Sequence, residues 1–96
     1  MNENVLITGA SGGIGLEFAR VFAKNGYDVV LVARNEQKLQ SIARDLEETF
    51  HIKADYVSAD LSEPDGAKKL YEEVLKRNIR VDQLVNNAGV SSGMTG

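Results

Sequence analysis

The sequence contains no cysteine and no tryptophan, and it has one histidine and one proline. Without cysteine the chain forms neither disulfides nor thiolate metal sites, and one histidine is too few for a histidine-based metal centre. No apolar run approaches the length of about 20 residues that spans a membrane. The polar first residues also lack the basic and apolar regions of a signal peptide. We therefore expect a cytoplasmic protein with no metal site and no membrane segment.

The charge balance argues against large anionic partners. The net charge of −3 provides no basic surface for nucleic acid or for an anionic membrane, so neither is expected as a partner. A chain of 96 residues can bury roughly 60–70% of its unfolded surface, which is enough for one core. We expect a single domain over residues 1–96.

Short apolar runs of strand character alternate with segments in which apolar residues recur at helical spacing. Strands are expected at residues 5–8, 29–33, 52–59 and 83–86, and helices at about 13–25 and 36–48. A third helix is expected to follow a capping box with proline at residues 62–65. Its inner face would carry Ala67, Leu70, Tyr71, Val74 and Leu75.

This order, β-α-β-α-β-α-β, predicts an α/β fold with a Rossmann-like parallel sheet and helices on both faces. The expected strand order is 3-2-1-4, truncated after the fourth strand, so the topological switch point lies between strands one and four. A ligand should therefore lie at the carboxyl ends of those two strands. The fourth strand would form an exposed edge that carries Leu84 and Val85.

A glycine-rich turn follows the first strand. Such a junction leaves backbone N–H groups unpaired at the positive end of a helix, and glycine allows a flat ligand to approach the main chain. The pyrophosphate of a dinucleotide fits this description, although the turn could also serve packing alone. The pattern is neither Gly-x-Gly-x-x-Gly nor an ATPase phosphate loop. It can be read as Thr8-Gly9-x-x-x-Gly13-x-Gly15 or with Gly12 as the middle glycine.

Arg34 stands at the end of the second strand, where dinucleotide-binding folds commonly place an acid that accepts from the ribose 2′-OH. A guanidinium at this place would instead hold a 2′-phosphate and favour NADP over NAD. Lys38, one helical turn later, can assist. The alternative is a solvated arginine that precedes a helix.

Two further polar elements follow strands three and four. Asp60, before Leu61, can accept from an adenine amino group or can act as a turn residue. Asn86 and Asn87 can satisfy backbone groups of the loop that they begin. Ser11 can add a hydroxyl to a phosphate or can be an ordinary turn residue.

Together, the Thr-Gly-x-x-x-Gly-x-Gly turn, Asp60-Leu61 and the Asn-Asn-Ala-Gly segment at residues 86–89 resemble the short-chain dehydrogenase/reductase family, in its compact single-domain branch. The resemblance covers the whole chain and implies an NAD(P)-dependent oxidoreductase that acts on a small carbonyl or alcohol substrate, homo-oligomeric at full length. Members that use NADP often carry a basic residue at the position of Gly12. The implied cofactor-binding residues are Gly9, Ser11, Gly12, Gly13, Ile14, Gly15, Arg34, Asp60, Leu61, Asn87, Ala88 and Gly89.

The family's catalytic residues are a serine, a Tyr-x-x-x-Lys pair and a supporting asparagine, all beyond the fourth strand. Ser91 and Ser92 come too early to match the serine. We expect no catalytic residue in this chain, which would then be the NADP-binding portion of a reductase and inactive by itself. Each tyrosine is followed four residues later by a residue other than lysine: Leu31 after Tyr27, Asp60 after Tyr56 and Leu75 after Tyr71.

Two other functions compete with this interpretation. One is a stand-alone nucleotide-binding or regulatory module without catalysis. The other is an S-adenosylmethionine methyltransferase, which requires an acid at the end of strand two, where Ala33 and Arg34 stand.

Overall fold

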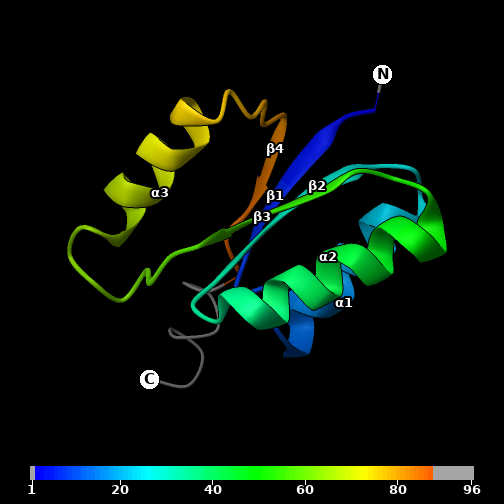
Figure 1. Cartoon of the computed structure of the whole chain (residues 1–96), viewed down its shortest axis with the longest axis horizontal. Helices are drawn as coiled ribbons and strands as arrows, with labels where there is room; N and C mark the ends of the chain where they lie inside the picture. Colours follow the sequence, from blue (N-terminus) through cyan, green and yellow to red (C-terminus); the bar gives the residue numbers. More distant parts are fainter. Residues whose placement is uncertain (1, 88–96) are drawn as a thin grey trace.

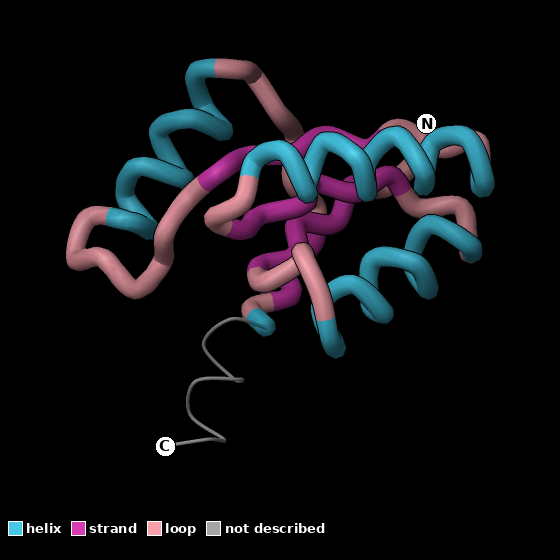
Figure 2. The backbone as a smooth tube through the Cα atoms, turned by 60° about the horizontal axis from the view of Figure 1, so that its bottom comes forward, coloured by secondary structure: helices cyan, strands magenta, loops and turns pink. Residues whose placement is uncertain are grey.

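The computed structural model describes residues 2–87, which form a parallel sheet of four strands with three helices. The strands lie in the order β3-β2-β1-β4, which confirms the predicted fold. α1 and α2 lie together on one side of the sheet and α3 lies apart from them on the other (Figures 1 and 2). The elements are β1 (Asn4–Thr8), α1 (Gly13–Lys24), β2 (Asp28–Ala33), α2 (Glu36–Phe50), β3 (Ala54–Ser58), α3 (Gly66–Lys76) and β4 (Gln83–Val85).

The sheet separates two apolar clusters because successive strand residues point to opposite faces. Ile7 and Leu31 are fully buried against α1 and α2, whereas Val30 and Val32 are fully buried on the face that α3 covers. β2 is thus buried on both faces, which explains its continuous apolar run. The α1–α2 side holds the larger cluster, to which the helices contribute Ala19, Ala23, Leu39, Ala43 and Leu46.

The prediction of a capping box at residues 62–65 was wrong. α3 begins at Gly66, and the N-cap residue Asp65 makes no side-chain capping bond. The Ser62 hydroxyl donates instead to the Asp60 carboxylate, at 2.5 Å. Short polar side chains bond neighbouring groups in turns as readily as they cap helices, and here the turn after β3 uses the serine.

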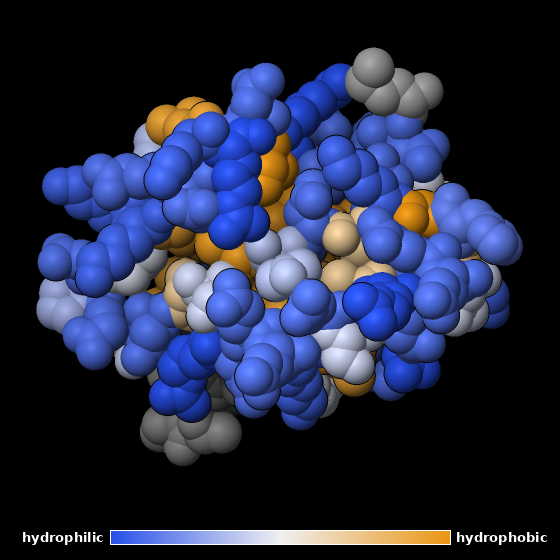
Figure 3. Space-filling model, in the orientation of Figure 1, coloured by the Kyte–Doolittle hydropathy of each residue, from blue (hydrophilic) through white to orange (hydrophobic). Residues whose placement is uncertain are grey.

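The inner face of α3 was also predicted only in part. Val74 is buried, but 65% of Tyr71 and 60% of Leu75 are exposed, and Ala67 is exposed as well. The reason is that α3 packs on β3 and leaves β4 uncovered, so Leu84 is 64% exposed. Apolar surface, coloured orange, is correspondingly open beside α3 in Figure 3.

β4 is fixed to β1 by hydrogen bonds at its start. The Asn4 N–H donates to the Asp82 carboxylate and the Asp82 N–H donates to the Asn4 carbonyl, both at 2.8 Å. These bonds set the parallel register in which Leu6 lies beside Leu84. The carboxyl ends of β1 and β4 are therefore neighbours, as the switch-point prediction requires.

Within residues 2–87, no helix combines the length and apolar character needed to cross a bilayer. The same part of the chain holds no group of three acidic, histidine or cysteine side chains placed to bind a metal ion.

Candidate functional site

The turn between β1 and α1 needs three of its four glycines. Gly9 and Gly13 have φ values of 64° and 58°, in the left-handed region that glycine adopts without steric cost. Gly15 is required for a different reason, since a Cβ there would lie 2.0 Å from the Gly9 carbonyl oxygen. Gly12 is extended, with φ −179°, and any residue can adopt that conformation. The pattern Thr-Gly-x-x-x-Gly-x-Gly is therefore the one with a structural basis.

The N-terminus of α1 is open. Gly12 is its N-cap residue and offers no side chain to the helix, and the first turn contains no acidic residue. The first bond of the helix runs from the Leu16 N–H to the Gly12 carbonyl, at 3.4 Å. In the part of the chain that the structure describes, no group accepts from the backbone N–H of Gly13, Ile14 or Gly15. Unpaired amides at the positive end of a helix are suited to an anion.

Hydrogen bonds anchor this turn to both neighbouring strands. The buried Ala10 donates its N–H to the Val32 carbonyl of β2 at 3.0 Å. The Thr8 hydroxyl lies 3.2 Å from the Asn86 side-chain oxygen, and the Asn87 amide donates to the Gly9 carbonyl at 3.5 Å. The paired asparagines thus brace the turn, which is one of the two roles expected for them.

A cleft of about 740 Å³ opens beside the turn at the carboxyl ends of the strands. This volume is in the usual range for small-molecule sites, about 300–1,000 Å³. Of the residues selected from the sequence, Gly9, Ser11, Arg34, Asp60 and Leu61 line it. Ala88 and Gly89 lie outside the described residues. The other selected residues lie in the described part of the chain but do not line the cleft: Gly12, Gly13, Ile14, Gly15 and Asn87.

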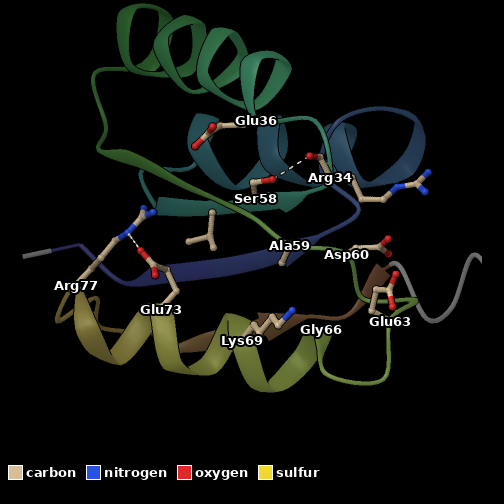
Figure 4. A pocket seen from close by; sticks show the side chains of 11 residues that line it. Arg34, Glu36, Ser58, Ala59, Asp60, Glu63, Gly66, Lys69, Glu73 and Arg77 are labelled. Atoms are coloured by element: carbon tan, nitrogen blue, oxygen red, sulfur yellow. Dashed lines mark hydrogen bonds and ion pairs between the residues drawn. The ribbon is translucent and has the colours of Figure 1, made fainter.

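Arg34 enters the cleft from the end of β2. Ser58 of β3 donates its hydroxyl to the Arg34 carbonyl at 2.9 Å, which fixes the arginine backbone. The guanidinium itself has no hydrogen-bond or ion-pair partner within residues 2–87. Figure 4 shows Arg34 beside Asp60, whereas Arg77 lies at the opposite end with Glu73. Arg34 is therefore available to an anionic ligand.

Asp60 is held in a tight turn by Ser62. The Ser62 hydroxyl and backbone N–H both donate to one oxygen of the Asp60 carboxylate, at 2.5 and 3.0 Å. These bonds lower the pKa of Asp60, burial opposes them, and the nearby Arg34 guanidinium lowers the pKa further. One carboxylate oxygen thus serves the turn, and the other has no hydrogen-bond partner within residues 2–87.

An adjoining hollow of about 490 Å³ extends from Arg34 along β3 to α3 (Figure 4). Its far end is internally satisfied, because Arg77 pairs with Glu73 and donates to the Tyr56 carbonyl at 2.8 Å. This second bond caps the outer edge of β3. The hollow shares Arg34, Ala59 and Asp60 with the cleft.

Sequence reasoning missed Gly66, the first residue of α3. A Cβ there would lie 2.0 Å from the Asp60 carbonyl oxygen, so the turn that carries Asp60 packs on this glycine. The sequence did contain a signal for this contact, because Gly66 stands directly after Pro64 and Asp65, where the third helix was expected to begin. Asn86 was noted in the motif but not selected, although it lines the cleft, as do Asn35, Ser62 and Ala67.

None of the three tyrosines lines the cleft. Tyr27 packs edge-on against Phe22, with ring centroids 5.3 Å apart, and Tyr56 joins the same apolar cluster. Tyr71 lies on the exposed face of α3. No tyrosine is therefore placed to act as an acid on a molecule bound in the cleft.

The sequence matches the short chain dehydrogenase family over residues 3–95. This chain belongs to that family. Among its short-chain dehydrogenase relatives, the 11-beta-hydroxysteroid dehydrogenase A of Sesamum indicum is 41% identical over 88 residues, which are 92% of this chain and 25% of the relative. The chain thus spans about a quarter of the length of that curated relative.

Solved structures of short-chain dehydrogenases have the same fold. The L-sorbose reductase of Gluconobacter frateurii, solved with NADPH and L-sorbose, has a TM-score of 0.79 and 38% identity, covering 86% of this chain and 32% of that one. A short-chain dehydrogenase of Sphingobium yanoikuyae, solved with NADPH, has a TM-score of 0.75 and 38% identity, covering 85% and 32% respectively.

Proposed function

We propose that residues 1–96 form a single dinucleotide-binding domain, the NADP(H)-binding portion of a short-chain dehydrogenase/reductase. The full enzyme would transfer hydride between NADP(H) and a small carbonyl or alcohol substrate, as a homo-oligomer. One observation carries the proposal: Gly9 and Ser11, in the turn that leads into the open N-terminus of α1, line the same cleft as Arg34, whose guanidinium has no partner within the described residues. Two anion-binding elements on one cleft suit a ligand with two separate phosphate groups.

Each part of the cofactor has a proposed set of contacts. The turn at residues 9–15 holds the pyrophosphate through its backbone N–H groups, and Arg34 holds the 2′-phosphate. Asp60 and Leu61 line the adenine, with the second Asp60 oxygen available to the amino group. Asn87, together with Ala88 and Gly89, flanks the ribose next to the nicotinamide.

The residues present fit this cofactor. The cleft has the volume of a ligand site, and the two turn residues that line it, Gly9 and Ser11, add little side-chain bulk. When bound, the nicotinamide ring of the cofactor accepts or donates the hydride. The chain itself binds and orients: the α1 amides fix the diphosphate, and Thr8 and Asn87 hold the turn to β4. None of these side chains transfers a proton.

Catalysis would therefore depend on residues that this chain does not supply. The positions of the three tyrosines outside the cleft support this. We expect no reductase activity from the 96-residue chain with NADPH and carbonyl substrates.

Calorimetric titration of the folded chain tests the binding function. We expect 2′,5′-ADP to bind nearly as well as NADPH, because the adenosine side of the site is complete here. 5′-ADP, which lacks the 2′-phosphate, should bind more weakly. Failure of both NADPH and 2′,5′-ADP to bind the folded chain would contradict the proposal.

A stand-alone nucleotide-binding module without chemistry is the second candidate, and the same tyrosine positions favour it. Calorimetry does not separate the two. A reading frame that continues beyond Gly96 into a Tyr-x-x-x-Lys segment would eliminate the stand-alone module.

A further inference from the structure

The C-cap residue of α1, Asn25, is followed by Gly26, and this is the one Asn-Gly pair in the sequence. Both residues are exposed. Asparagine before glycine readily loses its side-chain amide, because glycine has no side chain to shield its backbone nitrogen from the neighbouring carbonyl. Asn25 is therefore a candidate for a covalent change that needs neither an enzyme nor a cofactor.

The reaction closes and then opens a five-membered ring. The Gly26 backbone nitrogen loses its proton to base and bonds to Cγ of Asn25, and the Nδ2 group takes a proton from solvent and leaves as ammonia. Water then adds to one of the two carbonyls of this succinimide and breaks the bond from that carbonyl to the nitrogen. The product is aspartate or, when the chain continues through Cγ, isoaspartate. Water is the co-reactant, and nothing is oxidised or reduced.

Backbone hydrogen bonds at the end of α1 oppose the attack. Gly26 has a φ of 88°, and its N–H donates to the Ala23 carbonyl at 3.0 Å. The Tyr27 N–H donates to the Phe22 carbonyl at the same distance. These two bonds form the Schellman arrangement that closes many helices. The proton that must leave the attacking nitrogen is thus held in a hydrogen bond of the helix.

The leaving amide and the backbone torsion are held as well. Asn25 Nδ2 donates to the Val21 carbonyl at 2.7 Å, so the side chain points back along the helix. The Asn25 ψ of 13° places the Gly26 nitrogen almost in line with the backbone nitrogen of Asn25 itself. Ring closure requires the Gly26 nitrogen to rotate to the side of the Cα–C bond that carries Cβ. The folded geometry is therefore unreactive until this end of α1 opens.

An aromatic contact stabilises the closed cap. The Phe22 and Tyr27 rings meet edge to face, with centroids 5.3 Å apart, and pack against the larger apolar cluster. The same two residues share one of the backbone bonds of the cap. A hydrophobic contact of this kind commonly accompanies the Schellman arrangement. Opening the cap must therefore separate the two rings.

We propose that Asn25 is a site of spontaneous deamidation that the Phe22–Tyr27 contact and the cap of α1 protect in the folded protein. Local opening of the helix end, and not global unfolding, sets the rate. Either product weakens α1. A carboxylate stands at the negative end of the helix and offers no amide to the Val21 carbonyl, and isoaspartate also adds a backbone atom within the cap. The modification thus loosens, irreversibly, the helix that begins at the glycine turn.

Incubation of the full chain in mildly alkaline buffer tests the proposal, with conversion of Asn25 followed by mass spectrometry of the peptide that contains it. We expect the folded chain to react at least about tenfold more slowly than the chain unfolded in guanidinium chloride, because the cap must first open. Equal rates in the two states, or no conversion of Asn25 in the unfolded chain, would overturn the proposal.

Three variants separate the cap from overall stability, with folding checked by circular dichroism. Tyr27→Leu keeps an apolar side chain but loses the edge-to-face contact, so the folded variant should deamidate roughly two- to tenfold faster than the wild type. Tyr71→Leu, on the exposed face of α3, should keep the wild-type rate. Thr8→Val weakens the link between β1 and β4 and should also keep that rate, because the opening is local. An unchanged rate in Tyr27→Leu, or equal acceleration in Thr8→Val, would contradict the assigned protection.

Discussion

Gly15 packs directly on the carbonyl of Gly9, and the 2.0 Å between that oxygen and an added Cβ leaves no space for a side chain. This contact fixes how α1 leaves the turn and hence where its amides point. Asn87 also contacts this site, since its side-chain amide nitrogen would lie 2.9 Å from a Cβ on Gly15.

Serine substitutions at two glycines test this contact as a matched pair. Gly15→Ser should lower the free energy of unfolding by about 1–3 kcal/mol, because an overpacked site must shift its neighbours. Serine otherwise suits a helix a few tenths of a kcal/mol better than glycine, so the expected sign is opposite to propensity. Gly12→Ser should leave stability unchanged or slightly raised, since serine is a good N-cap residue. Urea denaturation measures both, and equal effects would contradict the packing argument.

Arg34→Asp should invert the preference between the two cofactors. The variant loses a charge-assisted bond to the 2′-phosphate and gains an acceptor for the ribose 2′-OH, so the NADPH-to-NADH affinity ratio should fall by about ten- to a hundredfold. Arg44→Asp, an exposed charge reversal on α2, is the control. An unchanged ratio from fluorescence titration would remove Arg34 from the account.

Thr8→Val tests the link between β1 and β4. The buried Thr8 hydroxyl lies within reach of the Val85 carbonyl and the Asn86 side-chain oxygen, and valine keeps the shape while removing the donor. We expect a loss of about 0.5–1.5 kcal/mol in the free energy of unfolding. Thr49→Val, exposed on α2, should be close to neutral. A Thr8→Val chain as stable as the wild type would show that the hydroxyl does not join the strands.

We expect Asp82 to account for part of the loss of folding stability at acid pH. The Asn4 N–H and the Arg80 guanidinium both donate to its carboxylate, which lowers the pKa of Asp82 in the folded state. A depressed folded pKa contributes stability above the ordinary aspartate pKa of about 3.9 and loses it as the pH falls through the folded value. Asp82→Asn should therefore flatten the loss of stability below about pH 4.

Thermal melts from pH 7 to pH 2.5 measure that slope. Asp45→Asn, at an exposed position of α2 without a bond to the described residues, should keep the wild-type slope. The wild-type slope in Asp82→Asn would contradict the assignment.

Much of the fold could be predicted because the signals were local and repeated. The apolar run at β2 indicated a strand buried on both faces, and the alternation of elements gave the strand order. Glycine is required at Gly9 and Gly13 because both have positive φ. A glycine-rich turn after a strand indicates such a conformation. The cleft then follows from topology.

What could not be predicted depended on contacts between elements. Ser62 bonds Asp60 and does not cap α3, a choice that local sequence leaves open. Tyr71 and Leu75 follow helical spacing, yet nothing in their spacing reveals that α3 leaves β4 uncovered. The Lys38 ammonium lies 3.8 Å from the place of a Cβ on Gly12, and this approach likewise depends on how α2 packs.

The central claim is that the amides at the start of α1 hold the cofactor's diphosphate. The most direct measurement is an NMR titration of the ¹⁵N-labelled chain with NADPH, followed at each backbone amide. The account predicts that the largest saturable shifts fall on Gly13, Ile14 and Gly15, with Arg34 also affected. Saturable binding that leaves those three amides unmoved would contradict it.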